Sequence, residues 1–238
     1  MTLRRAQLIP DTLQPSGDGV TGAQIAAVLI EGETHRAYVK MLPAEHCAAE
    51  AFCALLLKTW GLSVPEPVLV EHEGSVWFGS LDAEYPSLKQ RFQINRNWPE
   101  EVMEALVKTA AEVVSAFPSV GLACAADEAI NNNDRNLGNI LWDGGEPSWI
   151  DHERALGMEP GDRNKLAELA LIADKAADVQ RSAIAAALTM ARDVLSGVEE
   201  QIPGDVSHFT ALVSARLTRI GNLVDARFPA PAHDLFSQ

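Results

Sequence analysis

A polar segment followed by two short apolar runs is the feature that most constrains the fold of this chain. Residues 131–136 contain four asparagines, one aspartate and one arginine. The run 139–142 then has the pattern of a strand, 143–147 contains two glycines and a proline, and 148–151 forms a second strand-like run. Two strand patterns joined by a glycine-containing turn predict a β-hairpin. Such a hairpin would bring its final residue, Asp151, back beside its first.

Three polar side chains of this segment suit phosphoryl transfer. Asp134 lies in the polar loop, Asn139 opens the hairpin and Asp151 closes it. Transfer of a γ-phosphoryl group needs a carboxylate that orients the attacking hydroxyl, and magnesium held against the nucleotide phosphates. Magnesium prefers oxygen ligands, commonly one or two carboxylates together with phosphates and waters. The spacing predicts Asp134 as the catalytic base and Asn139 and Asp151 as metal ligands.

A purely structural interpretation of the same residues is also available. Asparagine and aspartate are common in turns because their side chains hydrogen-bond to their own backbone, and an aspartate at a strand end is commonly solvated. The combination of a polar loop, a hairpin of suitable length and an acid at its end favours the catalytic interpretation.

A glycine-containing stretch near the N-terminus supplies a second part of the pattern. Three glycines, Gly17, Gly19 and Gly22, lie within residues 15–24. Glycine allows backbone N–H groups to turn toward an anion without interference from a Cβ atom. The residues that follow predict strands over 25–30 and 36–41, then a helix over 43–60.

Two charged residues lie on these predicted elements. Lys40 lies on the second strand and Glu50 within the helix. A strand lysine paired with a helix glutamate is how protein kinases position nucleotide phosphates. Each residue taken alone is also consistent with a solvated surface position.

In this order the motifs resemble those of the HipA-like kinases, a branch of the protein-kinase-like fold that also includes phosphatidylinositol kinases. The resemblance spans most of residues 15–157 and is strongest over 131–155. The segments that carry it are Gly22-Ala23-Gln24, Lys40, Glu50, Asn133-Asp134-Arg135, Asn139 and Trp149-Ile150-Asp151-His152.

The resemblance implies an α+β, two-lobed protein-kinase-like fold. Residues 1–80 would form a small lobe with an antiparallel sheet, one helix and the nucleotide loop, and 81–98 a hinge or connector. Residues 99–238 would form a larger, mainly helical lobe that carries the catalytic loop and the metal-binding hairpin. Helical patterns in that lobe are expected over 99–117, 121–130, 166–177, 179–197 and 205–228.

The resemblance also implies roles for individual residues, with ATP and Mg²⁺ as cofactors. Lys40 would contact the α and β phosphates and Glu50 would orient it. Asp134 would be the base, and Asn139 and Asp151 would hold magnesium. The remaining nucleotide contacts would come from the loop Gly22, Ala23 and Gln24, and from Phe78, Gly79 and Ser80 in an adenine hinge over 77–82.

Two places depart from the family pattern. HipA toxins carry a serine used for self-regulation just ahead of the Gly-Ala-Gln sequence, where this chain has Gly19, Val20 and Thr21. Many relatives have glycine after the Asp-His pair, where this chain has Glu153.

Composition limits the partners. The net charge is −14 at pH 7 and 47% of residues are apolar. An acidic chain lacks the basic face that nucleic acid requires and is disfavoured at an anionic membrane, so neither partner is expected. No run approaches the ~20 apolar residues of a membrane helix and no apolar signal core follows the basic start, so a cytoplasmic location is expected.

Two smaller groups of residues complete the inventory. Three cysteines, Cys47, Cys53 and Cys124, lack metal-site spacing and are expected to be buried thiols. Lys89, Arg91 and Arg96 form a local basic cluster in the connector, either as a solvated loop or as a guide for an acidic substrate.

Three functions remain open at this stage. The resemblance implies a kinase that acts on a serine or threonine of a protein, with an antitoxin or other regulator as partner. A small-molecule kinase of the aminoglycoside-phosphotransferase type would use the same Asp, Asn and Asp, with an acceptor site built by the helices after residue 160. A nucleotide-binding pseudokinase or regulatory partner would retain the fold without transferring phosphate.

Overall fold

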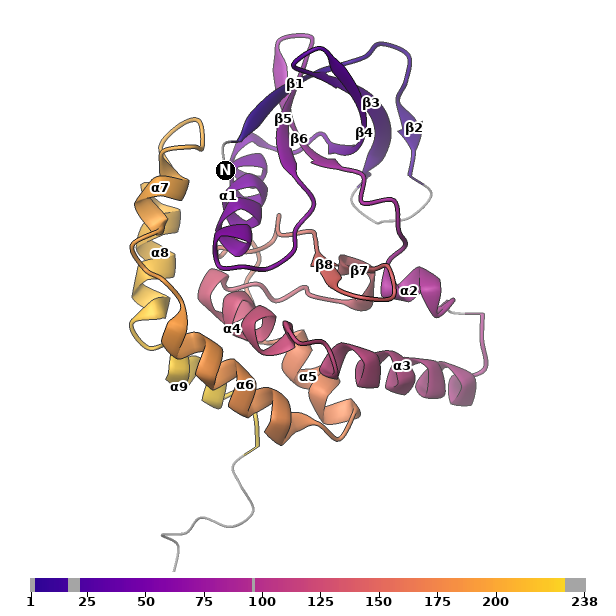
Figure 1. The fold of residues 1–238 in the computed structure, drawn as a ribbon, viewed down its shortest axis with the longest axis vertical. Helices are drawn as coiled ribbons and strands as arrows, with labels where there is room; N and C mark the ends of the chain where they lie inside the picture. Colours follow the sequence, from indigo (N-terminus) through magenta and orange to yellow (C-terminus); the bar gives the residue numbers. More distant parts are fainter. Residues whose placement is uncertain (1–2, 17–21, 96, 230–238) are drawn as a thin grey trace, which may run out of the picture.

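Strands and helices separate into two regions of the molecule. The computed structural model describes residues 3–16, 22–95 and 97–229. Figure 1 shows the larger sheet and helix α1 at one end, most of the other helices at the other end, and α7 (Leu195–Glu199) and α8 (Ser207–Leu217) beside α1. The α+β class expected from the sequence is therefore confirmed.

The larger sheet closes on itself. Within the described residues its strand order is β1-β5-β6-β4-β3-β2, and β1 also pairs with β3, so that five strands form a ring. β1 is parallel to β5, whereas the sequence predicted an antiparallel sheet. This pairing joins segments about sixty residues apart, and no local pattern marks it. The strands are β1 Arg4–Leu8, β2 Gln14–Pro15, β3 Gln24–Ile30, β4 Glu33–Lys40, β5 Pro67–His72 and β6 Ser75–Leu81.

Two tight hairpins set the register of the ring. Ile30 pairs with Glu33 across β3 and β4, and the two residues between them, Glu31 and Gly32, have φ of 51° and 89°. The loop Glu73-Gly74 between β5 and β6 has the same character, with φ of 48° and 79°. Positive φ at both central residues is the type I′ geometry that matches strand twist.

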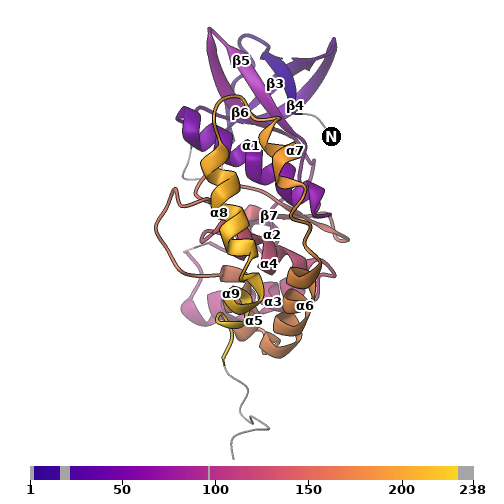
Figure 2. The ribbon, with the colours of Figure 1, turned by 90° about the vertical axis from the view of Figure 1, so that its left-hand side faces the viewer.

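Helix α1, Ala44–Thr59, lies against the ring and connects it to the helical region. Its Phe52 and Leu56 are fully buried. The Phe52 ring lies 5.7 Å from that of Phe209 on α8, centroid to centroid. Figure 2 shows α7 and α8 in front of α1, and Figure 1 shows them beside it. The helix predicted over 43–60 is confirmed, and one continuous apolar core runs from α1 into the helical region.

Helix α4, Val120–Ile130, is the centre of the helical region. All of its residues except Leu122 are buried, and it contacts α5, α6, α8 and α9. No single helix in the described ranges is long and apolar enough to cross a membrane; α3 and α4 reach that length only as a pair bent by 95°. The other helical elements are α2 Leu88–Arg91, α3 Glu100–Ser115, η1 Leu137–Asn139, α5 Lys165–Ile172, α6 Ala176–Thr189, α7 Leu195–Glu199, α8 Ser207–Leu217 and α9 Ile220–Asp225.

A buried carboxylate fixes the C-terminal helices to α4. Glu128 accepts hydrogen bonds from Arg227 at 2.7 and 3.2 Å and from Arg216 at 3.2 Å. Asn164 donates a further bond to it at 3.1 Å. A buried carboxylate is tolerated when it is paired and hydrogen-bonded in this way. The C-terminal segments are therefore held against α4 by ion pairs as well as by apolar contacts.

The last predicted helix, 205–228, is in fact two helices. The break falls between Leu217 and Ile220, where the hydroxyl of Thr218 bonds to the carbonyl of Ala215 at 2.6 Å and competes for a helical acceptor. Likewise, the helix expected over 166–177 ends at Ile172, because Asp174 adopts a left-handed φ of 56°. Periodicity predicted the presence of these helices and missed the breaks.

The three cysteines are buried and free, as the sequence predicted. Burial raises the pKa of Cys47 to about 11 and raises that of Cys53 and Cys124 well above the ordinary value. None of these thiols is therefore poised as a nucleophile.

Because α4 packs closely on α6, adding one methyl group at Gly121 should destabilise the fold. A Cβ added at Gly121 would lie 2.6 Å from the backbone carbon of Ser182 on α6. We expect Gly121→Ala to lower the free energy of unfolding by about 1–3 kcal/mol, the usual cost of overpacking. Gly221→Ala on α9 is the matched control, because no atom lies within 4 Å of the added Cβ. It should be neutral, or stabilising by up to ~1 kcal/mol through helix propensity. Chemical denaturation of both variants measures the difference, and equal stabilities would contradict the packing argument.

Candidate active site

Lys40, the last residue of β4, lies at the centre of a charged cluster between the two regions. Its Nζ is 2.6 Å from Asp151 Oδ1, 3.0 Å from Glu153 Oε2 and 3.3 Å from Glu50 Oε1. The lysine side chain is only 12% exposed. The contact expected between Lys40 and Glu50 is confirmed, and Asp151 meets the same ammonium. Glu153, at a position where the HipA-like sequence pattern often has glycine, is its third carboxylate.

Burial and charge oppose one another in this cluster. Burial alone would lower the pKa of Lys40, but the carboxylates of Glu50, Asp151 and Glu153 outweigh it and raise that pKa above its ordinary value. Burial raises the pKa of the Glu50 carboxyl to about 7, although Lys40 favours its charged form. Three carboxylates thus meet one ammonium, and the cluster carries excess negative charge when all are ionised.

His152 connects this cluster to helix α1. Its backbone N–H donates to the second carboxylate oxygen of Glu50, so that Glu50 holds both Lys40 and the segment after the hairpin. The imidazole is buried, and burial lowers its pKa well below the ordinary value. It is therefore neutral near pH 7. Its Nε2 is buried without a hydrogen-bond partner among the described residues.

The loop that carries Asp134 is positioned from α4. The Asn132 side-chain amide donates to Asp127 Oδ1 at 2.9 Å, and its oxygen accepts from the Asp134 backbone N–H at 3.1 Å. The Asn139 amide donates to the Asp134 carbonyl at 2.8 Å. Both neighbours therefore fix the backbone of Asp134 and leave its carboxylate available for other contacts.

Arg135 connects this loop to the hairpin through buried hydrogen bonds. Its guanidinium donates to both carboxylate oxygens of Asp127, at 2.9 and 3.1 Å, and both side chains are almost completely buried. The same group donates to the Ile150 carbonyl at 2.5 Å and the Asn139 carbonyl at 3.4 Å. It also lies over the Trp149 ring, 5.7 Å from the centroid. One buried cation thus connects α4, the loop and both strands of the hairpin.

The hairpin brings Asn139 and Asp151 to its open end, as expected. β7, Ile140–Trp142, pairs with β8, Pro147–Trp149, and the Ile150 N–H donates to the Asn139 carbonyl at 3.1 Å. Both predicted strands are shorter than expected. Asn139 ends the short helix η1 that Asn136 caps, and Asp151 follows β8 with a left-handed φ of 67°. The backbone thus leaves the strand direction at Asp151, and the carboxylate of this residue contacts Lys40.

Two cations that the sequence did not indicate lie against Asp134. Lys165 Nζ is 2.6 Å from Asp134 Oδ1, and Arg154 is 3.5 Å from Oδ2. They come from beyond the hairpin and from the start of α5, twenty and thirty-one residues after Asp134. No motif surrounds either residue, so only the tertiary structure identifies them.

The predicted nucleotide loop is described in part. Gly22 is exposed with φ of 70°, and Gln24 begins β3, where it pairs with Val39 beside Lys40. Ala23, between them, is partly buried. Gly17 and Gly19 lie outside the described residues.

Phe78, Gly79 and Ser80, expected in an adenine hinge, are interior residues of β6. All three pair with β4 on one edge and with β5 on the other. Phe78 is buried, and a Cβ added at Gly79 would lie 2.7 Å from a methyl group of Val70. Strand pairing thus occupies this segment, and the connection between the two regions begins after Leu81.

The donor set fits a magnesium–nucleotide site better than a metal site built from protein ligands alone. Among the described residues, no group of three or more His, Cys, Asp or Glu side chains is arranged to hold a metal ion. Magnesium bound with a nucleotide needs only one or two carboxylates, because phosphates and waters complete its shell. Asp151 and the side-chain oxygen of Asn139 supply that chemistry at the open end of the hairpin.

Comparison with solved structures identifies the fold. No protein-family model matches the sequence, and no curated protein matches it. The proinflammatory kinase CtkA of Helicobacter pylori is similar with a TM-score of 0.56 and 12% identity over 95% of this chain and 98% of that chain. WaaP, solved in complex with acyl carrier protein, has a TM-score of 0.35 and 16% identity over 88% of this chain and 89% of its own. The likeness to CtkA shows a protein-kinase-like fold.

The buried ion pair beneath the loop predicts a large stability effect. Asp127→Asn keeps the shape of the side chain but leaves the Arg135 charge buried without its partner, so we expect a loss of about 3–5 kcal/mol in the free energy of unfolding. The control is Asp178→Asn, which breaks an exposed pair with Arg181 and should cost less than about 1 kcal/mol. Urea denaturation of both variants makes the comparison, and losses of similar size would refute the structural role of the buried pair.

Proposed function

We propose that the protein is an ATP- and Mg²⁺-dependent kinase that transfers the γ-phosphoryl group to a hydroxyl, that of a serine or threonine in a protein. The observation that carries the proposal is the convergence on Lys40. A strand lysine meets a helix glutamate at 3.3 Å and the hairpin-end Asp151 at 2.6 Å. Asp134 and Asn139 lie on the loop that Arg135 fixes to that hairpin.

Different residues would bind the phosphates and the magnesium ion. Lys40 would bind the α and β phosphates, with Glu50 holding its ammonium in place. Asn139 and Asp151 would hold magnesium, which neutralises phosphate charge when bound. The excess of carboxylate around Lys40 favours a divalent cation there. A triphosphate would replace the contacts of Lys40 with Asp151 and Glu153, while the contact with Glu50 remains.

Asp134 would orient the acceptor hydroxyl and take its proton as the new P–O bond forms and the bond from the γ phosphorus to the bridging oxygen breaks, with ADP as the leaving group. The Asn132 and Asn139 side chains hold its backbone, so the carboxylate needs little reorganisation before reaction. Lys165 and Arg154 keep compensating positive charge beside it. Because the carboxylate is already paired with two cations, we assign Asp134 mainly to positioning the acceptor hydroxyl.

The HipA-like assignment rests on the motifs of the sequence. Gly22-Ala23-Gln24 and the segment from Asn133 to His152 support it. A toxin-type role, a regulatory partner and a cytoplasmic location remain predictions of that resemblance. A kinase of the aminoglycoside-phosphotransferase type would share the catalytic set, so the acceptor site discriminates between the two.

Loss of the base should separate transfer from binding. We expect Asp134→Ala to reduce phosphoryl transfer at least 10²-fold and to leave the dissociation constant for Mg-ATP nearly unchanged. Radiolabelled ATP with a lysate as acceptor measures the first quantity, and calorimetry the second. Asp143→Ala in the hairpin turn is the matched control and should retain both. Full transfer by the Asp134 variant would remove that residue as base; absence of transfer by the unaltered protein, with nucleotide still bound, would favour the pseudokinase.

Loss of the proposed metal ligand should uncouple magnesium from nucleotide binding. At a ligand concentration one hundred times Kd, Mg-ATP should stabilise the protein by about 2.7 kcal/mol, which raises Tm by roughly 5–10 °C in a chain of this size. In Asp151→Ala we expect magnesium to add nothing to the shift that ATP gives alone. A thermal-shift titration with and without magnesium tests this expectation. A magnesium-dependent shift that survives in the variant would exclude Asp151 as ligand.

A further inference from the structure

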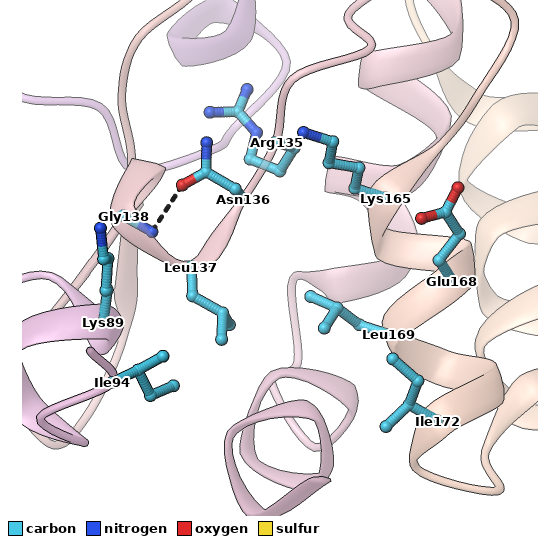
Figure 3. Close-up of a pocket in the computed structure, with 10 residues that line it drawn as sticks. All are labelled: Lys89, Ile94, Arg135, Asn136, Leu137, Gly138, Lys165, Glu168, Leu169 and Ile172. Atoms are coloured by element: carbon cyan, nitrogen blue, oxygen red, sulfur yellow. Dashed lines mark hydrogen bonds between the residues drawn. The ribbon is translucent and has the colours of Figure 1, made fainter. Parts of the chain in front are cut away.

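A groove of about 340 Å³ lies beside the proposed catalytic loop. Its walls come from α2 and the residues that follow it, from the loop before β7, and from α5. Figure 3 shows side chains from these segments gathered around a common space. The lining residues are Lys89, Ile94, Arg135, Asn136, Leu137, Gly138, Lys165, Glu168, Leu169 and Ile172.

The floor of the groove is apolar. Ile94, Leu137, Leu169 and Ile172 reach into it from three different segments (Figure 3). Ile172 is 44% exposed although it is a large aliphatic residue. A concave apolar surface with few polar groups is typical of binding sites.

The charged groups of the groove differ in how far they are already paired. Arg135 is held by Asp127, Lys165 by Asp134, and the Glu168 carboxylate by Arg163 through hydrogen bonds of 2.6 and 2.7 Å. Lys89 is exposed and has no ion pair among the described residues. It is therefore the cation of the groove that remains available for an incoming group.

Lys89 belongs to the basic cluster noted in the sequence. Arg91 donates to the Trp142 carbonyl at 2.8 Å and lies over the Trp142 ring. Arg96 lies outside the described residues. In a chain of net charge −14, one unpaired lysine beside an apolar floor provides a local preference for negative charge.

One lining residue of the groove contacts the proposed base. Lys165 lines it and contacts Asp134 at 2.6 Å, and the residues from Asn136 to Gly138 belong to the same loop as Asp134. A molecule lying in the groove would therefore present a neighbouring hydroxyl to Asp134.

We propose that this groove binds the acceptor, and that the acceptor is a protein segment with an aliphatic and an acidic residue close to its serine or threonine. The aliphatic side chain would pack on Leu169 and Ile172, and the acidic one would pair with Lys89. Apolar and charged contacts from separate segments suit an extended chain, which presents its side chains in different directions. This inference rests on the proposed kinase function and specifies its substrate class.

Peptide substrates test the acidic preference directly. The peptides share one sequence that contains a serine with a leucine nearby. They differ only at one further position, which is either glutamate or lysine and is moved along the peptide from one pair to the next. The protein phosphorylates each peptide in the presence of Mg-ATP, and the rates are compared. We expect the glutamate peptide to be phosphorylated faster at the position that meets Lys89. Lys89→Glu should lower the glutamate-to-lysine rate ratio by on the order of five-fold or more. Lys175→Glu, an exposed lysine outside the groove, should leave the ratio unchanged.

The apolar contact has a matched pair on one helix. Ile172 lines the groove and Leu171 does not, yet both are 44% exposed. Ile172→Ala should raise KM for the leucine-containing peptide several-fold and remove most of its advantage over an alanine-containing peptide. Leu171→Ala should change neither quantity.

The outcomes distinguish this inference from the proposed function. Phosphorylation of peptides with no glutamate preference at any position, or with equal ratios for Lys89→Glu and Lys175→Glu, overturns the acceptor site and leaves the kinase intact. Transfer to small hydroxyl compounds but to no peptide also overturns it. Absence of transfer to any acceptor, with nucleotide bound, overturns the kinase and this inference together.

Discussion

The bidentate pair between Asp127 and Arg135 is the interaction on which the rest of the site depends. Its two charges are buried, so each compensates the other at a place where neither would be stable alone. The same guanidinium also binds carbonyls on both sides of the hairpin. These contacts fix the positions of a helix, a loop and two strands relative to one another. The positions of Asp134 and Asp151, which lie on or next to these segments, are therefore fixed as well. The precision of the site therefore originates in a residue that has no role in the proposed chemistry.

A second charged cluster joins the sheet to the helical region. Lys40 comes from the ring of strands, Glu50 from α1, and Asp151 and Glu153 from the segment after the hairpin. Apolar contacts between α1 and α8 support the same junction. The nucleotide site proposed here thus lies where the two regions are already held by opposite charges, and a phosphate ligand would compete for the same lysine.

Local patterns in the sequence predicted local structure well. The two type I′ turns, helix α1 and the β7–β8 hairpin each follow from a few adjacent residues, and the Lys40–Glu50 contact follows from their order. Contacts between distant segments left no such signal. The parallel pairing of β1 with β5, and the approach of Lys165 to Asp134, depend on how the chain returns upon itself. The adenine hinge expected over 77–82 falls largely within β6, and order along the chain does not reveal that this strand is paired on both edges.

The closed ring of strands limits where the molecule can bend. Each of its five strands is hydrogen-bonded on both sides, so distortion within it would break ladder bonds, and α1 is packed against it. Lys40 and Glu50 therefore belong to one packed and hydrogen-bonded unit. The chain passes into the helical region through residues 82–87, between β6 and α2. A change in the separation of Lys40 from Asp151 would therefore also have to displace the packing of α1 against α7 and α8, which couples this one distance to the apolar junction.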